Sequence, residues 1–155
     1  MIHLVTITGK ERFWNIHQKY LYEMTQFYDD KMDEEGNYHY GHFDSYFEND
    51  PDRKALYMVS DRNIVGFALI NRYSHVGNDI DYAMAEFTIF PVYRKNNYGS
   101  ESVKRIFSVY SGKWEIKYNL KNYKAVRFWT KATREFMPEV INLNEDEQII
   151  CFSTI

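Results

Sequence analysis

The chain has 155 residues, a net charge of -3 at pH 7, 45% hydrophobic residues and 18% aromatic residues. The hydrophobic content argues against a disordered chain, and the length predicts one domain over residues 1–155. The slightly acidic charge argues against nucleic-acid binding, which normally needs a basic face. Because no apolar run is long enough to span a bilayer and no signal-peptide pattern begins the chain, we expect a cytoplasmic protein without membrane contacts.

The first predicted elements are a strand and an amphipathic helix. Residues 2–8 alternate and are rich in β-branched side chains, which predicts a strand. Apolar side chains recur at helical spacing through residues 11–30, which predicts a helix with one buried face. His17 falls near the edge of that face, where we expect a surface histidine or one with satisfied hydrogen bonds rather than a ligand.

Residues 29–52 combine many acidic side chains and several aromatic ones with a single lysine, Lys31. Two interpretations stay open for this segment. It is either a solvated loop with a short helix near residues 43–49, or an acidic wall lined by aromatic rings that attracts a cationic substrate.

Three strands are predicted next, at residues 55–60, 64–73 and 80–90, joined by turns into an antiparallel meander. Strict alternation in the third strand predicts two faces: one holds Tyr82, Met84, Glu86 and Thr88, and the other holds Ala83, Ala85, Phe87 and Ile89. A carboxylate midway along an apolar strand is a local conflict of the kind found at functional sites.

The second half of the chain is predicted to contain a helix over 99–111, a strand over 113–118, a helix over 122–136 and a last strand within QIICFSTI (148–155). Strand 80–90, helix 99–111 and strand 113–118 form a βαβ unit, so the two strands should be parallel. The only cysteine, Cys151, lies in the last strand, where we expect a buried structural thiol. The fold class is therefore α/β (α+β), with a mixed and mostly antiparallel sheet.

The stretch PVYRKNNYGSESVKRIF (91–107) predicts an anion site. The βαβ unit places the free amides and the positive dipole end of helix 99–111 beside the end of strand 80–90. Arg94 and Lys95 add positive charge, and Ser100 offers a hydroxyl. Asn97 tolerates a left-handed conformation, and Gly99 lets the backbone approach a ligand. The sequences GxxxxGK and GxGxxG are both absent, so this is neither a P-loop nor a dinucleotide fingerprint.

EFTIFPVYRKNNYGSESVKRIF resembles the acyl-CoA-binding motif of the GCN5-related N-acetyltransferase (GNAT) superfamily, whose turn has Arg or Gln, two residues, Gly, one residue, and Gly or Ala. NYKAVRFW (122–129) resembles the family's second CoA-side motif, and the order of elements matches over nearly the whole chain. Two positions depart from the pattern: Asn97 replaces the first glycine, and Trp129 stands where many members have a tyrosine that protonates the leaving thiolate.

The resemblance implies a single acyl-CoA N-acyltransferase domain over residues 1–155. It implies a GNAT-like sheet with a splayed parallel strand pair and helices on both faces, acetyl-CoA as cosubstrate, and no metal. Pantetheine would pair with the strand at Phe87–Ile89, and the pyrophosphate would lie on the amides of Lys95–Ser100. Asn122 would contact pantetheine or cap its helix. The implied binding residues are Phe87, Thr88, Ile89, Arg94, Lys95, Asn96, Asn97, Tyr98, Gly99, Ser100, Asn122, Phe128 and Trp129.

The resemblance also implies catalytic roles. Glu86 is the candidate base that accepts the amine proton, with pairing to Arg72 as the alternative. Tyr118 is the candidate acid, with Tyr123 as a second choice, although a thiolate of pKa ~8.5 can leave without one. The expected activity is acetyl transfer to a primary amine on a small cationic molecule or a peptide. The alternative is a non-catalytic acyl-CoA sensor. A homodimer is a further expectation, since dimers are common in the family.

Overall fold

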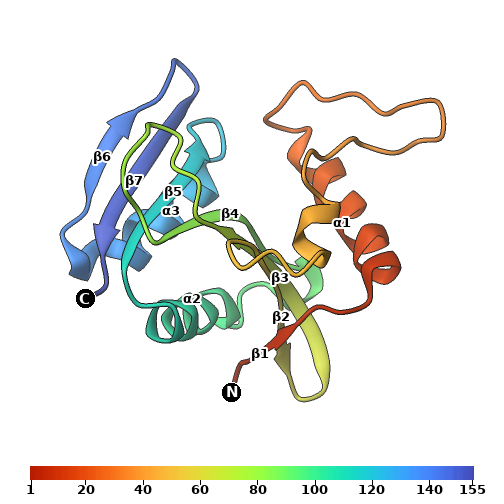
Figure 1. The fold of residues 1–155 in the computed structure, drawn as a ribbon, viewed down its shortest axis with the longest axis horizontal. Coiled ribbons are helices and arrows are strands. Elements are labelled where there is room, and N and C mark those ends of the chain that lie inside the picture. The colour runs from red at the N-terminus through yellow and green to blue at the C-terminus, as the bar shows by residue number, and fades with distance from the viewer.

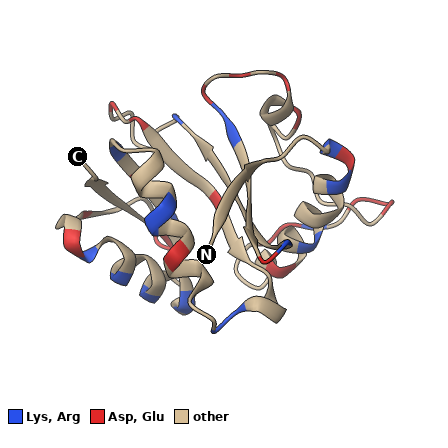
Figure 2. Ribbon diagram, turned by 90° about the horizontal axis from the view of Figure 1, so that it is seen from below, with Lys and Arg blue, Asp and Glu red and all other residues tan.

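The computed structural model describes residues 1–155 and contains one seven-stranded sheet in the order β1-β2-β3-β4-β5-β7-β6. Helices lie on both faces of this sheet (Figure 1 and Figure 2). The strands are β1 (His3–Thr6), β2 (Lys54–Ser60), β3 (Asn63–Asn71), β4 (Tyr82–Ile89), β5 (Lys113–Asn119), β6 (Glu139–Asn142) and β7 (Glu147–Ser153). The helices are α1 (Lys10–Met24), α2 (Tyr98–Val109) and α3 (Tyr123–Thr133), with short 3-10 turns at Asp44–Phe47, Pro91–Tyr93 and Arg134–Phe136.

The pairing of β4 with β5 is the only parallel pairing in the sheet, and it is short. It runs from Tyr82 opposite Trp114 to Met84 opposite Ile116. Beyond these residues, β4 stays paired with β3 up to Ile89, and β5 stays paired with β7 up to Asn119. The two strands therefore separate after a common start, which confirms the predicted βαβ unit and the splayed pair.

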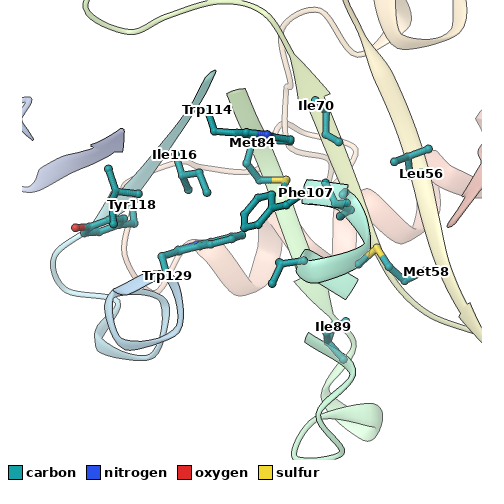
Figure 3. Packing of buried hydrophobic residues seen from close by; sticks show 14 of the residues in the cluster. Leu56, Met58, Ile70, Met84, Ile89, Phe107, Trp114, Ile116, Tyr118 and Trp129 are labelled. Carbon is teal, nitrogen blue, oxygen red and sulfur yellow. The ribbon is translucent and has the colours of Figure 1, made fainter. Parts of the chain in front are cut away.

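Two hydrophobic clusters fill the two sides of the sheet. The larger cluster packs α2 and α3 against β4 and β5, with Trp114, Ile116, Phe107 and Trp129 among its buried side chains (Figure 3). The smaller cluster lies under α1 and contains Phe13, Phe43, Phe67 and Leu69. We refer to these sides as the α2–α3 face and the α1 face.

One extra residue in β4 changes which side chains reach each face. Met84 lies opposite Ile70, but Glu86 lies opposite Leu69, so Ala85 is a bulge. Residues directly opposite in an antiparallel pair share a face. Met84 and Phe87 therefore belong to the α2–α3 face, while Glu86 joins Leu69 on the α1 face. The prediction that Met84 and Glu86 share a face was wrong, because it assumed unbroken alternation.

Two other differences from the predicted elements have local causes. Helix α1 ends at Met24, where the backbone amides of Thr25 and Gln26 donate to the carbonyls of Tyr22 and Glu23, three residues back, in place of the helical pattern. The side chains of Thr25 and Gln26 donate to the same two carbonyls and reinforce this turn. Strand β6 was not predicted, since it has only four residues and gains its ladder from β7. None of the helices is long and apolar enough to cross a bilayer.

Gly66 provides a test of how tightly β3 holds the end of β4. A Cβ at this position would lie 2.1 Å from the carbonyl oxygen of Thr88. We expect Gly66→Ala to lower the free energy of unfolding by about 1–3 kcal/mol, because the backbone of β4 must shift. Urea denaturation measures this change. Gly41→Ala is the matched control, since a Cβ at that position would have no other atom within 4 Å. Equal stability of the two variants would contradict the close approach.

Candidate functional site

The turn between β4 and α2 presents a row of free backbone donors. The six consecutive N–H groups from Lys95 to Ser100 donate to no acceptor within the protein. Lys95 and Asn97 both have positive φ, at 67° and 62°. Alternating backbone conformations of this kind turn successive amides toward a common point, and the N-terminus of α2 adds its positive dipole. The turn is therefore suited to binding an anionic group such as a phosphate.

Asn97 adopts the left-handed conformation that the sequence predicted, immediately before α2. Its side chain makes no capping hydrogen bond. The left-handed region costs asparagine less than other non-glycine residues. Asn97 can therefore keep the geometry of the glycine it replaces in the motif.

Arg94 does not add its charge to this turn in the way the sequence suggested. Its guanidinium donates twice to the carboxylate of Glu23 on α1, at 2.9 and 2.8 Å. Its Nε donates to the carbonyl of Ile89 at 2.7 Å. A bidentate pair of this type fixes geometry as well as charge. Arg94 thus ties the end of α1 to the end of β4, and Lys95 is the cation left at the turn.

Aromatic packing explains the positions of four other predicted residues, Phe87, Gly99, Phe128 and Trp129. A Cβ on Gly99 would lie 2.9 Å from Cε1 of Phe128, so this glycine lets α2 pack closely against α3. Phe128 in turn stacks on Phe87 with ring centroids 5.6 Å apart, and the buried Trp129 meets both rings edge-on. Asn122 caps α3, with its Oδ1 accepting from the amide of Ala125 at 3.2 Å.

Glu86 is a half-buried carboxylate without an ion pair. Arg72, its alternative partner, instead lies 3.5 Å from Asp52. Burial raises the pKa of Glu86 from 4.5 to about 7, and this rise is opposed by the hydroxyl of Tyr20 and the charge of Lys117. The carboxylate is therefore set to exchange a proton near neutral pH.

Four tyrosines lie on the same side as Glu86, and the sequence did not identify them as a group. Tyr20 and Tyr28 come from α1 and the turn after it, and Tyr40 and Tyr46 come from the 29–52 segment. All four are half-buried. Burial raises the pKa of each hydroxyl, with a smaller contribution from the Glu86 charge, so all four stay neutral. The only signal in the sequence was the high tyrosine count, 14 in the chain.

Tyr118, the candidate acid, lies on the opposite side of the sheet from Glu86. It belongs to the cluster on the α2–α3 face, together with Trp129 (Figure 3). Its hydroxyl donates to Oε1 of Gln148 at 3.1 Å. The structure therefore does not bring Tyr118 and Glu86 together.

The acidic residues of the 29–52 segment do not form a continuous wall. Several hold local cations: Asp44 binds Lys10 at 2.6 Å, Asp50 binds Arg53 at 2.5 Å, and Asp29 binds Lys31 at 2.5 Å. Asp33 accepts from the amides of its own turn. The part of this segment that approaches Glu86 is aromatic rather than acidic.

His17 is fully buried, and neither ring nitrogen has a hydrogen-bond partner. The prediction of a surface or satisfied histidine was therefore wrong. The ring lies among aromatic rings, with the centroid of Tyr40 at 4.4 Å and that of Phe13 at 5.4 Å. Burial lowers the pKa of His17 from 6.5 to about 4. The ring therefore serves as a neutral packing group beneath Tyr20 and Tyr40.

Two further features bear on whether the chain uses a metal ion or a cysteine nucleophile. No group of three or more His, Cys, Asp or Glu side chains is arranged to hold a metal ion. Cys151 is half-buried on β7, and burial raises the pKa of its thiol, which does not favour a nucleophile. A surface hollow of about 730 Å³ lies between the start of α1 and residues 39–45, away from the turn at Lys95–Ser100.

No protein-family model and no curated protein matches the sequence. Solved structures do match the fold. An acetyltransferase from Thermus thermophilus has a TM-score of 0.71 and 13% identity, over 99% of this chain and 97% of its own. The GNAT domain of S. lividans PAT has a TM-score of 0.66 and 11% identity, over 98% of this chain and 89% of its own. Arabidopsis thaliana NAA60, solved with acetyl-CoA, has a TM-score of 0.65 and 12% identity, over 99% of both chains.

This chain has the GNAT fold. The seven-stranded sheet, the single parallel pair and the three helices agree with the architecture that the motif resemblance implied. The GNAT fold explains why the free amides at Lys95–Ser100 lie beside the splayed end of β4. It does not by itself assign an activity to the chain.

Substitutions of Asn97 test whether the left-handed backbone of the turn at Lys95–Ser100 is needed to bind acetyl-CoA. Asn97→Gly keeps access to the left-handed region, so acetyl-CoA should bind at least as tightly as to the wild type. Asn97→Val cannot adopt a φ of 62° without strain, and its affinity should fall at least about tenfold. Calorimetric titration measures both, with thermal unfolding as the check that each variant is folded. Equal affinities for the two variants would mean that this backbone geometry is not needed for binding.

The burial of His17 on the α1 face can be tested through the pH dependence of the free energy of unfolding. The pKa of His17 is lower in the folded state than in the unfolded state, so the unfolded chain binds a proton first as pH falls. Wild-type stability should therefore fall between pH 6.5 and 4 by up to about 3 kcal/mol from this group. His17→Phe should not lose stability in this way. In urea denaturation, the free energy of unfolding of this variant should rise relative to that of the wild type as the pH falls toward 4. His39→Phe, at an exposed histidine, is the control, and a gain there of the same size would refute the assignment.

Proposed function

We propose that this chain transfers an acetyl group from acetyl-CoA to a primary amine. The observation that carries the proposal is the juxtaposition of six free amides at Lys95–Ser100 with a splayed strand that bears an unpaired carboxylate, Glu86. The turn suits a pyrophosphate, and the strand edge suits an extended amide chain. NAA60 was solved with acetyl-CoA, and a Thermoplasma acidophilum N-acetyltransferase of the same fold was solved with coenzyme A.

Each part of acetyl-CoA has a partner of matching chemistry in this proposal. The pyrophosphate accepts hydrogen bonds from the amides of Lys95–Ser100 and is favoured by the charge of Lys95 and the dipole of α2. The pantetheine arm pairs with the edge of β4 at Phe87–Ile89, where β5 has moved away. The stacked rings of Phe87 and Phe128 form the apolar support for this arm.

The reaction is a direct displacement. The amine nitrogen attacks the thioester carbonyl carbon and forms a C–N bond, while an amide near Thr88 or Ile89 donates to the developing oxyanion. The C–S bond then breaks, and the sulfur leaves as the thiolate of CoA. The proton lost by the amine passes to Glu86, directly or through a water molecule. The products are an N-acetyl amine and CoA.

Burial on the α1 face is what makes Glu86 a suitable base. A carboxylate with a pKa near 7 accepts a proton more readily than an exposed glutamate, yet is ionised above neutral pH. A separate acid is not required, since a thiolate of pKa ~8.5 is an adequate leaving group. Tyr118, which lies on the other side of the sheet, therefore has no catalytic role in this proposal.

The decisive variant is Glu86→Gln, which keeps the shape of the side chain and removes the base. We expect kcat to fall about 10²- to 10⁴-fold while the Kd for acetyl-CoA changes less than about threefold. In the wild type, kcat should rise with pH through about 7 as Glu86 ionises, and this limb should be absent in the variant. Steady-state kinetics from pH 5.5 to 9 measure both effects.

Glu48→Gln is the matched control, because Glu48 is exposed on the 29–52 segment. Unchanged turnover in Glu86→Gln would remove Glu86 from the mechanism. Tight acetyl-CoA binding by the wild type without turnover on any amine would instead favour the alternative, a non-catalytic acyl-CoA sensor.

A further inference from the structure

The surface around Glu86 on the α1 face is rich in tyrosine rings, and this composition bears on the chemical class of the amine that accepts the acetyl group. Glu86 lies opposite Leu69 in the sheet, and Tyr20 packs on the neighbouring Phe67 with centroids 5.3 Å apart. Tyr40 packs edge-on to His17 on α1. The hydroxyl of Tyr46 accepts from Nδ2 of Asn71 at 3.2 Å, and the hydroxyl of Tyr28 donates to Glu147 at 2.8 Å. Tyrosine rings from three segments therefore converge on the side of the sheet that carries the carboxylate.

Three cations around this surface are already held by carboxylates. Lys117 of β5 lies 3.2 Å from Glu147, and Arg94 is held by Glu23. Arg53 is held by Asp50 and also lies over the ring of Tyr73, 4.6 Å from its centroid. The surface thus combines a carboxylate without an ion pair with several neutral rings, and Lys117, the cation whose charge acts on Glu86, is itself held by Glu147.

We propose that the acceptor is a monoamine whose nitrogen is attached to an aromatic body and which carries no second cation and no carboxylate. The inference rests on the proposed acetyl transfer. The amine reaches Glu86, and its cationic form is also attracted by the faces of the tyrosine rings. The aromatic body packs against these rings in offset or edge-on geometry. A polyamine or aminoglycoside would leave its further cations without a partner, and an acidic acceptor would meet three cations that carboxylates already hold.

The first test is a panel of amines with saturating acetyl-CoA at pH 8. The panel contains 2-phenylethylamine, 4-phenylbutylamine, n-butylamine, 1,4-diaminobutane and spermidine, and the readout is free thiol together with the mass of the product. We expect kcat/KM for the better of the two phenyl amines to be at least tenfold higher than kcat/KM for each of the three amines without a ring. Wild-type protein suffices for this test, so it does not depend on the folding of a variant.

The outcomes separate the two proposals. Highest kcat/KM for 1,4-diaminobutane or spermidine would overturn the acceptor class while supporting acetyl transfer. Equal values for n-butylamine and the phenyl amines would also overturn it, because the ring would then contribute nothing. If no amine is acetylated although acetyl-CoA binds, the proposed function fails and the acceptor class fails with it.

Two variants test the residues themselves. Tyr40→Leu should lower kcat/KM for the phenyl amine about tenfold, and for n-butylamine less than threefold, without changing the Kd for acetyl-CoA. Tyr22→Leu, at a tyrosine that is 62% exposed on α1, is the matched control and should change neither value. Asn71→Asp adds a carboxylate beside Tyr46. This variant should raise the ratio of kcat/KM for 1,4-diaminobutane to kcat/KM for n-butylamine at least fivefold. Equal losses for both amines in Tyr40→Leu, or no gain in Asn71→Asp, would contradict the assignment.

Discussion

The site depends on one extra residue in β4. Without the bulge at Ala85, the carboxylate of Glu86 would lie on the α2–α3 face, among the buried side chains that pack around Trp114 and Trp129. The bulge moves Glu86 to the α1 face and leaves Phe87 to pack on Phe128. Bulges commonly redirect a single side chain without breaking the strand. Here the result is a strand with aromatic support on one side and a partly desolvated carboxylate on the other.

The splay of β4 and β5 and the Arg94–Glu23 pair organise the rest of the site around that strand. The splay leaves an edge of β4 without a neighbour, next to the six free amides that begin α2. Arg94 connects this end of β4 to α1 through Ile89 and Glu23. Since α1 carries Tyr20, the same contacts also position the ring nearest to Glu86. The turn at Lys95–Ser100 and the aromatic surface are thus joined by a short chain of direct contacts.

The sequence predicted the features that arise from local preference. Alternation, helical periodicity and the βαβ order predicted nearly all the elements, and the tolerance of asparagine for positive φ predicted the conformation of Asn97. It did not predict features that depend on distant partners. Glu23 and Arg94 are 71 positions apart, and the bulge at Ala85 follows from pairing with β3. Likewise, neither the orphaned nitrogens of His17 nor the core position of Tyr118 is visible in a hydrophobic pattern.

The most direct test of the central claim is to map the amide resonances of isotope-labelled protein while coenzyme A is added. We predict that the largest shifts, and protection from hydrogen exchange, occur at Lys95–Ser100, with a second set along Phe87–Ile89. The amides of residues 41–45, which line the surface hollow away from this turn, should stay unchanged. Shifts concentrated at residues 41–45, or no shifts at millimolar coenzyme A, would contradict the claim that the free amides at the start of α2 form an acyl-CoA site.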